Sequence, residues 1–329
     1  MSYAVMAKDL IKTYRKGEVR ALDGLSLDVP EGTVLGVLGP NGAGKTTCVR
    51  ILATLLQPDS GSATVAGIDV AKHPDEVRKI IGLSGQYAAV DETLTGWDNL
   101  VMFGRLYHLG AKQAKVRAEE LLDQFSLTES ARRPIKTYSG GMRRRLDLAA
   151  SLIVKPKVLF LDEPTTGLDP RGRQDMWVVI EELVQGGVTL LLTTQYLEEA
   201  DQLADEIAVI DHGKVIARGT SDQLKTQVGG ERLEVTVDSI NLSAATSVLK
   251  QISGNEPLVD AQLRKVSVAA SGGSSVLTEI VRALDSANVQ ILDLALKRPS
   301  LDDVFMSLTG HVAEEENLET ATKKGRGRK

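Results

Sequence analysis

A glycine-rich loop that ends in lysine and threonine is the stretch of this sequence with the clearest chemistry. Its residues are Gly39, Pro40, Asn41, Gly42, Ala43, Gly44, Lys45 and Thr46. Glycines at this spacing let backbone N–H groups close around phosphates at the positive start of the following helix. Lys45 is predicted to reach the β- and γ-phosphates, and the Thr46 hydroxyl to enter a Mg²⁺ shell. The alternative is a glycine turn beside an unrelated lysine.

Two adjacent carboxylates, Asp162 and Glu163, follow the continuous apolar run 158–161. Such a run predicts a strand that is buried on both faces of a parallel sheet. Its carboxyl end would lie at the same sheet edge as the phosphate loop. Acids placed there cost stability unless they serve a cation or a water molecule, and this is our interpretation of the pair. The alternative is a solvated pair at a strand end.

Two further features could contribute to such a site. The triplet Ser139-Gly140-Gly141 precedes a helix that carries cations at its start, Arg143-Arg144-Arg145. A serine hydroxyl and backbone amides at a helix start form an anion site, although most such triplets are turns. Tyr14 lies upstream of the phosphate loop, where a tyrosine can stack a flat base; a core or surface tyrosine fits the spacing equally well.

The elements that must position these residues alternate between strand and helix. Residues 5–29 alternate apolar and polar positions around turn signals, which predicts an antiparallel β-region before the strand 34–38. A helix is predicted from Lys45 to about Leu56, and the helical periodicity of 93–125 predicts a helical insert. The whole pattern predicts an α/β fold: a mainly parallel sheet covered on both faces, an antiparallel β subdomain and the helical insert.

Composition excludes several classes of function. A net charge of −5 and a pI near 5.6 give no global basic field, which argues against nucleic acid as a partner. No apolar run approaches the roughly 20 residues needed to span a bilayer, and no signal peptide opens the sequence. The single cysteine, Cys48, allows no internal disulfide, which is typical of a cytosolic protein.

At 329 residues the chain is long enough for two domains. We expect the nucleotide-binding domain over 1–228, with a helical subdomain at about 90–155. The pair Gly229-Gly230 marks the expected start of a small α+β domain that runs to 310. The tail 311–329 combines an acidic run with a basic end and is expected to be disordered. Contact between that basic end and anionic lipid is the alternative.

Taken together and in this order, the motifs resemble those of the nucleotide-binding subunits of ATP-binding cassette (ABC) transporters. The resemblance implies ATP and Mg²⁺ as cofactors and an active ATPase. Glu163 would orient or deprotonate the attacking water, with Lys45 and Gln195 as further catalytic residues. The implied nucleotide contacts are Tyr14 on adenine, the Walker A loop Gly39 to Thr46, Thr47, Gln86 of the Q-loop, the signature Ser139, Gly140 and Gly141, and Asp169 of the D-loop. The implied metal residues are Thr46, Gln86 and Asp162.

In this family the signature contacts the γ-phosphate that is held by the opposite subunit, so the resemblance implies a homodimer that sandwiches two ATP molecules. The chain departs from the common pattern in two places. Tyr138 and Met142 flank Ser-Gly-Gly where leucine and glutamine are usual, and binding is expected to survive. Gln195 replaces the switch histidine; glutamine can donate a hydrogen bond but cannot carry positive charge. Since Glu163 remains, slower hydrolysis is expected rather than none.

Three stretches resemble the daunorubicin/doxorubicin-resistance ATP-binding proteins of actinobacteria more closely. They are the signature 138–142, the segment 193–201 and the run 301–311. This resemblance implies a separate polytopic membrane permease, docked near the helical insert after Gln86, and export of an amphipathic drug or lipid. The chain would then lie at the cytoplasmic face of the membrane. A soluble ABC-type ATPase in translation or repair, and a slow-turnover nucleotide-binding regulator, are the alternatives.

Overall fold

The computed structural model describes residues 2–14, 18–85, 89–227, 232–269, 274–297 and 299–309. Gln86 and the tail 311–329 lie outside the described residues. The described residues up to Thr220 form one compact unit, and those from Ser221 onward form a second. No helix among the described residues is long and apolar enough to cross a bilayer.

A six-stranded sheet forms the centre of the first unit. Five of its strands are parallel, and the edge strand β10 runs antiparallel to its neighbour β9. In spatial order the strands are β10 (Lys214–Gly219), β9 (Glu206–Asp211), β3 (Val34–Leu38), β8 (Thr189–Thr194), β7 (Val158–Asp162) and β6 (Ile81–Ser84). Every residue of β3, β7 and β8 is buried. Strands covered on both faces read as continuous apolar runs, which explains the pattern of the sequence.

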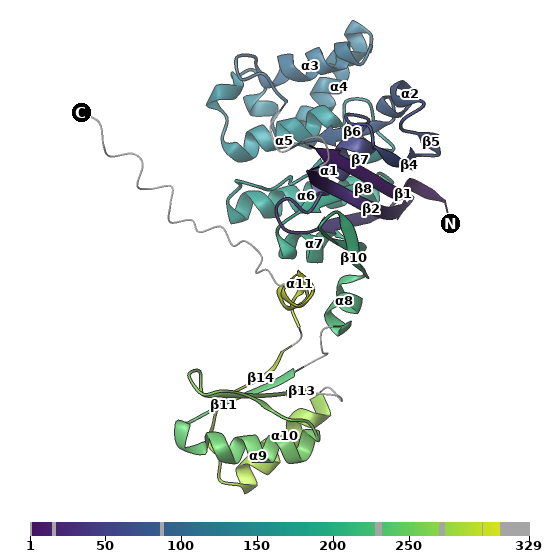
Figure 1. The fold of residues 1–329 in the computed structure, drawn as a ribbon. Coiled ribbons are helices and arrows are strands. Elements are labelled where there is room, and N and C mark those ends of the chain that lie inside the picture. Colours follow the sequence, from purple (N-terminus) through teal and green to yellow (C-terminus); the bar gives the residue numbers. More distant parts are fainter. Residues whose placement is uncertain are drawn as a thin grey trace, which may run out of the picture. The chain divides into compact units, whose positions relative to one another are not determined.

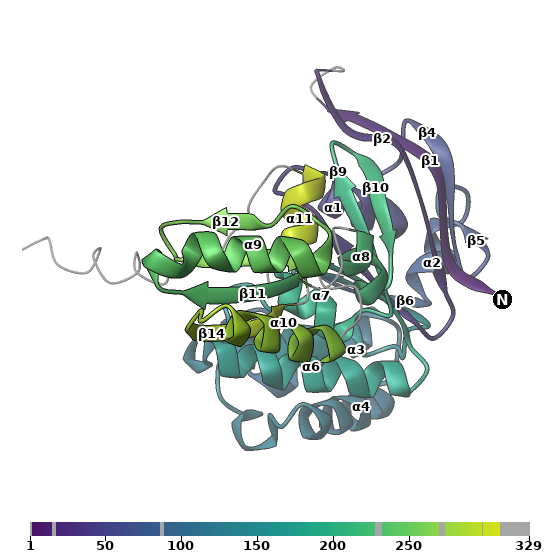
Figure 2. The same cartoon turned by 90° about the horizontal axis from the view of Figure 1, so that it is seen from below.

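An antiparallel sheet packs beside one face of the central sheet. Its order is β2 (Val19–Pro30), β1 (Tyr3–Tyr14), β4 (Ser60–Val65) and β5 (Ile68–Asp69). Figure 2 shows the long β1–β2 hairpin and the paired strands β9 and β10. Cys48 and Ile51 of helix α1 (Lys45–Leu52) share one core with residues of both sheets. This helix is shorter than expected because Thr54 takes a left-handed φ of 62° just beyond its end.

Helices cover the other face of the central sheet. Leu159 and Leu161 of β7 share a core with them, while Val158 and Phe160 point toward the antiparallel sheet. Besides α1, the unit has α2 (Pro74–Arg78), whose Val77 lies in the core shared with the antiparallel sheet. Its other helices are α3 (Gly96–Leu106), α4 (Ala111–Gln124), α5 (Gly140–Ser151), α6 (Pro170–Gln185) and α7 (Leu197–Leu203), with 3₁₀ turns at Thr128–Ser130 and Ile135–Thr137. Helices α3, α4 and α5 gather into the predicted helical insert (Figure 1). The α/β fold class is confirmed.

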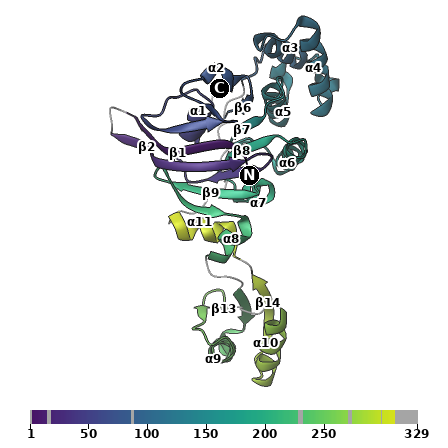
Figure 3. The same cartoon turned by 90° about the vertical axis from the view of Figure 1, so that its right-hand side faces the viewer.

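The second unit is built on a βαββαβ pattern in which the sheet is antiparallel and ordered β12-β13-β11-β14, a ferredoxin-like arrangement. Its elements are α8 (Ser221–Gln227), β11 (Arg232–Val237), a 3₁₀ turn (Ser239–Asn241), α9 (Leu242–Ser253), β12 (Leu258–Asp260), β13 (Lys265–Ala269), α10 (Ser274–Ser286), β14 (Ile291–Lys297) and α11 (Leu301–Thr309). Helices α9 and α10 lie on one face of the sheet (Figure 3). The unit starts at Ser221, ahead of the expected Gly229, because α8 packs on α11.

Candidate functional site

The phosphate loop folds tightly between β3 and α1. A side chain at Gly39 would stand 2.3 Å from the carbonyl oxygen of Ile210, and one at Gly44 would stand 2.4 Å from that of Ala21. These positions therefore admit only glycine. The Lys45 ammonium is buried and donates to the Gly39 carbonyl at 2.7 Å and the Pro40 carbonyl at 3.2 Å. Its charge therefore lies inside the loop.

Both carboxylates reach this loop from the end of β7. Asp162, 4% exposed, accepts hydrogen bonds from Thr193 Oγ1 at 2.5 Å and from Thr46 Oγ1 at 3.3 Å. Glu163, 8% exposed, lines a pocket of about 290 Å³ together with the loop residues Asn41 to Thr47. Its backbone adopts a left-handed φ of 53°, uncommon for a residue with a side chain. This conformation turns the chain at the strand end and places the glutamate beside the phosphate loop.

Gln195 lies at the same edge of the sheet. Leu38, the last residue of β3, pairs with Thr194, the last residue of β8, so that Gln195 follows directly beside the phosphate loop. Its side chain is half-buried. The guanidinium of Arg173 on α6 lies 5.0 Å from the ring centroid of the next residue, Tyr196. The parallel register therefore brings Gln195 to the loop and the carboxylates.

Tyr14 ends β1 close to the start of α1. Its hydroxyl lies 3.5 Å from Thr47 Oγ1, and the side chain is 36% exposed. An aromatic ring thus stands next to the phosphate loop with part of its surface open to a ligand. Gln86, the other expected nucleotide contact from this side, lies outside the described residues.

The Ser-Gly-Gly triplet and Asp169 come together at a different place. Ser139 caps α5 by accepting from the Met142 N–H at 3.3 Å, and Asp169 caps α6 by accepting from the Gly172 N–H at 2.9 Å. Both helix starts line a pocket of about 310 Å³ that includes Gly140 and Gly141. This pocket has no lining residue in common with the pocket of the phosphate loop. The structure therefore forms two separate pockets on one chain.

Comparison with known proteins identifies the family of this chain. The ABC transporter family model matches residues 22–166, and a model described as "ATP-binding protein DrrA1-3-like, C-terminal domain" matches residues 219–309. The daunorubicin resistance ATP-binding protein DrrA2 of Streptomyces coeruleorubidus is 57% identical, over 95% of this chain and 97% of its own length. The chain belongs to the DrrA-like ATP-binding subunits of ABC transporters. Membership of this family makes it an ATP-binding and ATP-hydrolysing enzyme.

Other relatives agree with this membership. The daunorubicin/doxorubicin resistance ATP-binding protein DrrA of Streptomyces peucetius is 49% identical, over 97% of this chain and 96% of its own length. Among solved structures, a dimeric ATP-binding cassette in a post-hydrolysis state bound to ADP and Pi matches with a TM-score of 0.61 and 25% identity. The match covers 66% of this chain and 98% of the chain in that structure. The fold and the family were thus both predictable from the motifs.

Tyr138 explains one departure of this ABC subunit from the common signature. Its ring is buried in the helical insert and its hydroxyl donates to the Ser130 carbonyl at 2.7 Å. A side chain at Gly96, where α3 starts, would meet that hydroxyl at 2.4 Å. The tyrosine therefore braces the helical insert, while Ser139 next to it lines the pocket.

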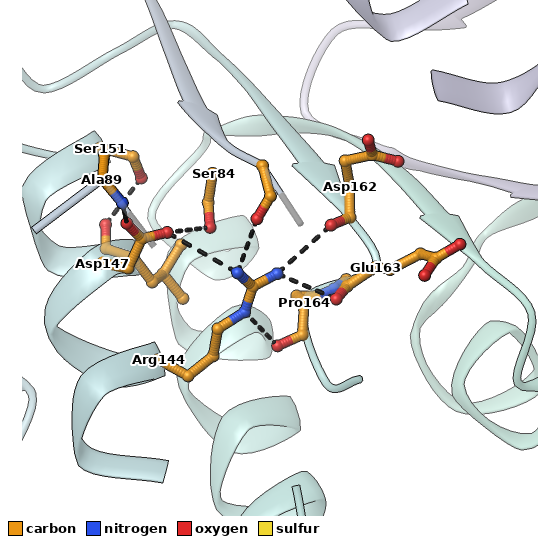
Figure 4. Close-up of polar contacts among 10 residues, drawn as sticks. Ser84, Ala89, Arg144, Asp147, Ser151, Asp162, Glu163 and Pro164 are labelled. Atoms are coloured by element: carbon orange, nitrogen blue, oxygen red, sulfur yellow. Dashed lines mark hydrogen bonds and ion pairs between the residues drawn. The ribbon is translucent and has the colours of Figure 1, made fainter. Parts of the chain in front are cut away.

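A buried arginine was missed by the sequence analysis, which treated Arg143-Arg144-Arg145 as one group of cations. Arg144 is 8% exposed and donates to main-chain carbonyls at the end of β7 and after β6 (Figure 4). Its partner Asp147 lies one turn later, with 3.7 Å between Nη1 and Oδ2. Burial lowers the pKa of Arg144 and raises that of Asp147, and their mutual attraction opposes both shifts. The sequence did hold a signal for this buried ion pair, because an arginine and an aspartate stand three residues apart on the apolar face of α5.

Glu199 on α7 is a second buried ionisable group that the sequence analysis did not single out. It is fully buried, and its Oε1 accepts from Trp177 Nε1 at 3.3 Å. Burial raises the pKa of this carboxyl from 4.5, although hydrogen bonds and the charge of Arg144 oppose the shift. The folded chain therefore binds more protons than the unfolded chain above about pH 4.5, so that Glu199 makes stability fall as pH rises through this range.

We expect Glu199→Gln to remove this loss. The free energy of unfolding of the variant should exceed that of the wild type by an amount that grows as pH rises above about 5, because only the wild type must then ionise a buried carboxyl. Urea unfolding followed by tryptophan fluorescence at several pH values measures the difference. Glu198→Gln, at the exposed neighbouring position, is the control. Parallel pH profiles for the wild type and Glu199→Gln would contradict the expectation.

Proposed function

We propose that this chain is the ATP-hydrolysing subunit of an exporter and acts as a homodimer that sandwiches two ATP molecules. Each ATP would lie between the phosphate loop of one copy and the Ser139-Gly140-Gly141 signature of the other. The observation that carries this proposal is the separation of the two half-sites. Each copy presents one pocket with Lys45 and Glu163 and another with Ser139 and Asp169, and the pockets share no lining residue. A second copy can complete each of them.

Mg²⁺ fits the residues beside the phosphate loop. The Thr46 hydroxyl and the Asp162 carboxylate already lie within 3.3 Å of each other, and both are the hard oxygen ligands that Mg²⁺ prefers. No group of three or more histidine, cysteine or acidic residues suited to a metal occurs among the described residues. This agrees with an ion that takes part of its shell from phosphate oxygens and water. Gln86 stays a sequence-based prediction as a further ligand.

The protein groups can be assigned roles in phosphoryl transfer, which depends mainly on positioning and charge stabilisation. Lys45 would turn from the loop carbonyls to the β- and γ-phosphates, and Tyr14 would stack the adenine. Glu163 would orient the attacking water and accept its proton. Gln195 would hold the γ-phosphate by a hydrogen bond, without supplying the positive charge of a histidine. Bound Mg²⁺ would neutralise part of the phosphate charge.

For the cargo we propose an amphipathic drug, such as an anthracycline-like antibiotic, or a lipid, exported through a separate polytopic permease. The support comes from the relatives, whose names refer to resistance to daunorubicin or doxorubicin. Such an export function would place the chain peripherally at the cytoplasmic face of the membrane. The relatives do not favour the soluble ATPase of translation or repair, or the slow regulator. Purification of the chain from its native membrane should recover a polytopic partner; recovery of ribosomes instead would overturn the transporter assignment.

Mixing two inactive variants tests the shared sites directly. Lys45→Ala damages only the phosphate-loop half of a site, and Ser139→Arg damages only the signature half. In a mixed dimer one site combines both lesions, and the other pairs two intact halves. Random mixing should therefore restore about one quarter of the wild-type ATPase rate in a symmetric dimer. Mixing Lys45→Ala with Glu163→Gln, which affect the same half, should restore nothing. Equal results from both mixtures would contradict the dimer.

Tyr14 provides a separate test of the nucleotide pose. We expect Tyr14→Ala to weaken ATP binding about tenfold, while Tyr14→Trp keeps the affinity because stacking needs a ring rather than a hydroxyl. Calorimetric titration with ATP measures both variants. Tyr107→Ala, at another exposed tyrosine, is the control and should bind like the wild type. Equal affinities for all variants would return Tyr14 to a structural role.

A further inference from the structure

We propose that Arg144 is a positioning residue for hydrolysis: it fixes the main chain at Glu163 and thereby holds the catalytic carboxylate toward the phosphate loop. This inference depends on the role proposed for Glu163. Arg144 lies on α5, five residues after Ser139, so it joins the signature helix to the carboxylate end of β7. It does not touch the nucleotide pocket and would act only through the main chain.

The geometry at Glu163 is the first support. Arg144 Nε donates to the Pro164 carbonyl at 2.6 Å, and Nη2 donates to the Glu163 carbonyl at 2.9 Å and the Asp162 carbonyl at 3.3 Å (Figure 4). Three consecutive carbonyls thus point at one guanidinium. Glu163 has a left-handed φ, which a residue with a side chain keeps only when its surroundings impose it. The guanidinium holds this turn from the α5 side, while the Glu163 N–H donates to the Thr193 carbonyl at 3.0 Å.

The other side of the guanidinium is equally constrained. Nη1 donates to the Gly85 carbonyl at 2.6 Å. Asp147 Oδ2 accepts from Ser84 Oγ, and its Oδ1 accepts from the Ala89 N–H, both at 2.7 Å. The Arg144–Asp147 pair therefore ties α5 to the main chain at the end of β6 as well as to β7. These contacts fix the guanidinium and let its position define that of Glu163.

Charge and shape explain why the residue is arginine. A planar guanidinium presents its donors as a rigid fork, whereas the lysine ammonium is a single point from which donors cannot reach carbonyls on opposite sides. Its buried charge needs compensation, and Asp147 provides it. A buried cation is a costly way merely to fill space, because an apolar side chain would do so without loss of solvation. The desolvation cost of the buried guanidinium is consistent with a need for fixed carbonyl positions.

The test compares Arg144→Lys with the wild type in steady-state ATPase assays and in binding of a fluorescent ATP analogue. The lysine keeps the charge beside Asp147 but cannot hold all of the carbonyls. We expect kcat to fall about tenfold or more while KM and nucleotide affinity stay within about twofold, because small displacements of a reacting group cost large factors in rate. Arg143→Lys, at the half-buried neighbour that pairs with Glu92 at 2.9 Å, is the matched control and should retain the wild-type rate.

Two results would overturn the inference. A folded Arg144→Lys protein with kcat within about twofold of the wild type would show that Glu163 needs no such support, and a parallel loss of nucleotide affinity would assign Arg144 to binding. Should Arg144→Lys not fold, the double change Arg144→Met with Asp147→Asn leaves no unpaired buried charge and is judged by the same criteria. Glu163→Gln is measured alongside. If that variant keeps its turnover, the catalytic role proposed for Glu163 fails, and the positioning inference fails with it. If Glu163→Gln loses turnover and the Arg144 variants keep theirs, only the positioning inference fails.

Discussion

Glu163→Gln is expected to lower the ATPase rate about 100-fold or more while ATP binding is retained. Glutamine has nearly the shape of glutamate but cannot accept the proton of the attacking water. Glu163 lines the pocket of the phosphate loop and Lys45 is unchanged, so the nucleotide should bind as before. Release of inorganic phosphate at saturating ATP and calorimetric titration measure the two properties separately.

A second consequence of the same change concerns assembly. A dimer that binds ATP without hydrolysing it should persist, so the Glu163→Gln protein should elute as a dimer when ATP and Mg²⁺ are present. Glu198→Gln, at an exposed position of α7, is the control for the charge change. Turnover of Glu163→Gln close to the wild-type rate would remove Glu163 from the catalytic role, whatever the assembly.

Lys45→Ala is expected to abolish both activity and tight ATP binding, with an affinity loss of about 10- to 100-fold. The ammonium is buried in the loop and supplies charge-assisted hydrogen bonds to phosphate, each of which contributes about 1.5–3 kcal/mol. The variant also leaves the Gly39 carbonyl without the donor it now has at 2.7 Å. Titration with ATP, and with ADP to show which phosphates are involved, measures the loss.

Lys79→Ala, at an exposed position after α2, should bind ATP like the wild type. The contrast between Lys45→Ala and Glu163→Gln is informative, because Lys45→Ala should remove ATP binding and Glu163→Gln only turnover. Unchanged ATP affinity in Lys45→Ala would mean that the backbone N–H groups at the helix start suffice, and that the lysine acts only during hydrolysis.

Local sequence determined what could be predicted about the fold and the candidate site. The strand 34–38 and the phosphate loop are contiguous, and the carboxylates directly follow their apolar run, so their placement at one sheet edge needed only the rule for parallel strands. The fold class is confirmed for the same reason. The roles of these residues remain proposals, but the structure does bring Lys45, Thr46, Asp162 and Glu163 together.

What could not be predicted depends on which faces meet in three dimensions. The burial of Arg144 follows from the rotation of α5 against β6 and β7, and its neighbours Arg143 and Arg145 have the same local chemistry. Strand β12 has no signal in the sequence, because its three exposed residues carry no alternating pattern. Helix α8 is short, and only its packing on α11 identifies it.

Cys48 offers a practical route to the motion that such a dimer would make. The thiol is buried in α1, and burial raises its pKa to about 12, so almost no thiolate is present near neutral pH. Labelling reagents react with the thiolate and not with the thiol. The native chain is therefore silent toward these reagents. A cysteine introduced at the exposed Val178 on α6 would carry the only label. Two copies would then form a symmetric pair of probes, and the distance between them would follow each ATP cycle spectroscopically without removal of any native residue of the phosphate loop helix.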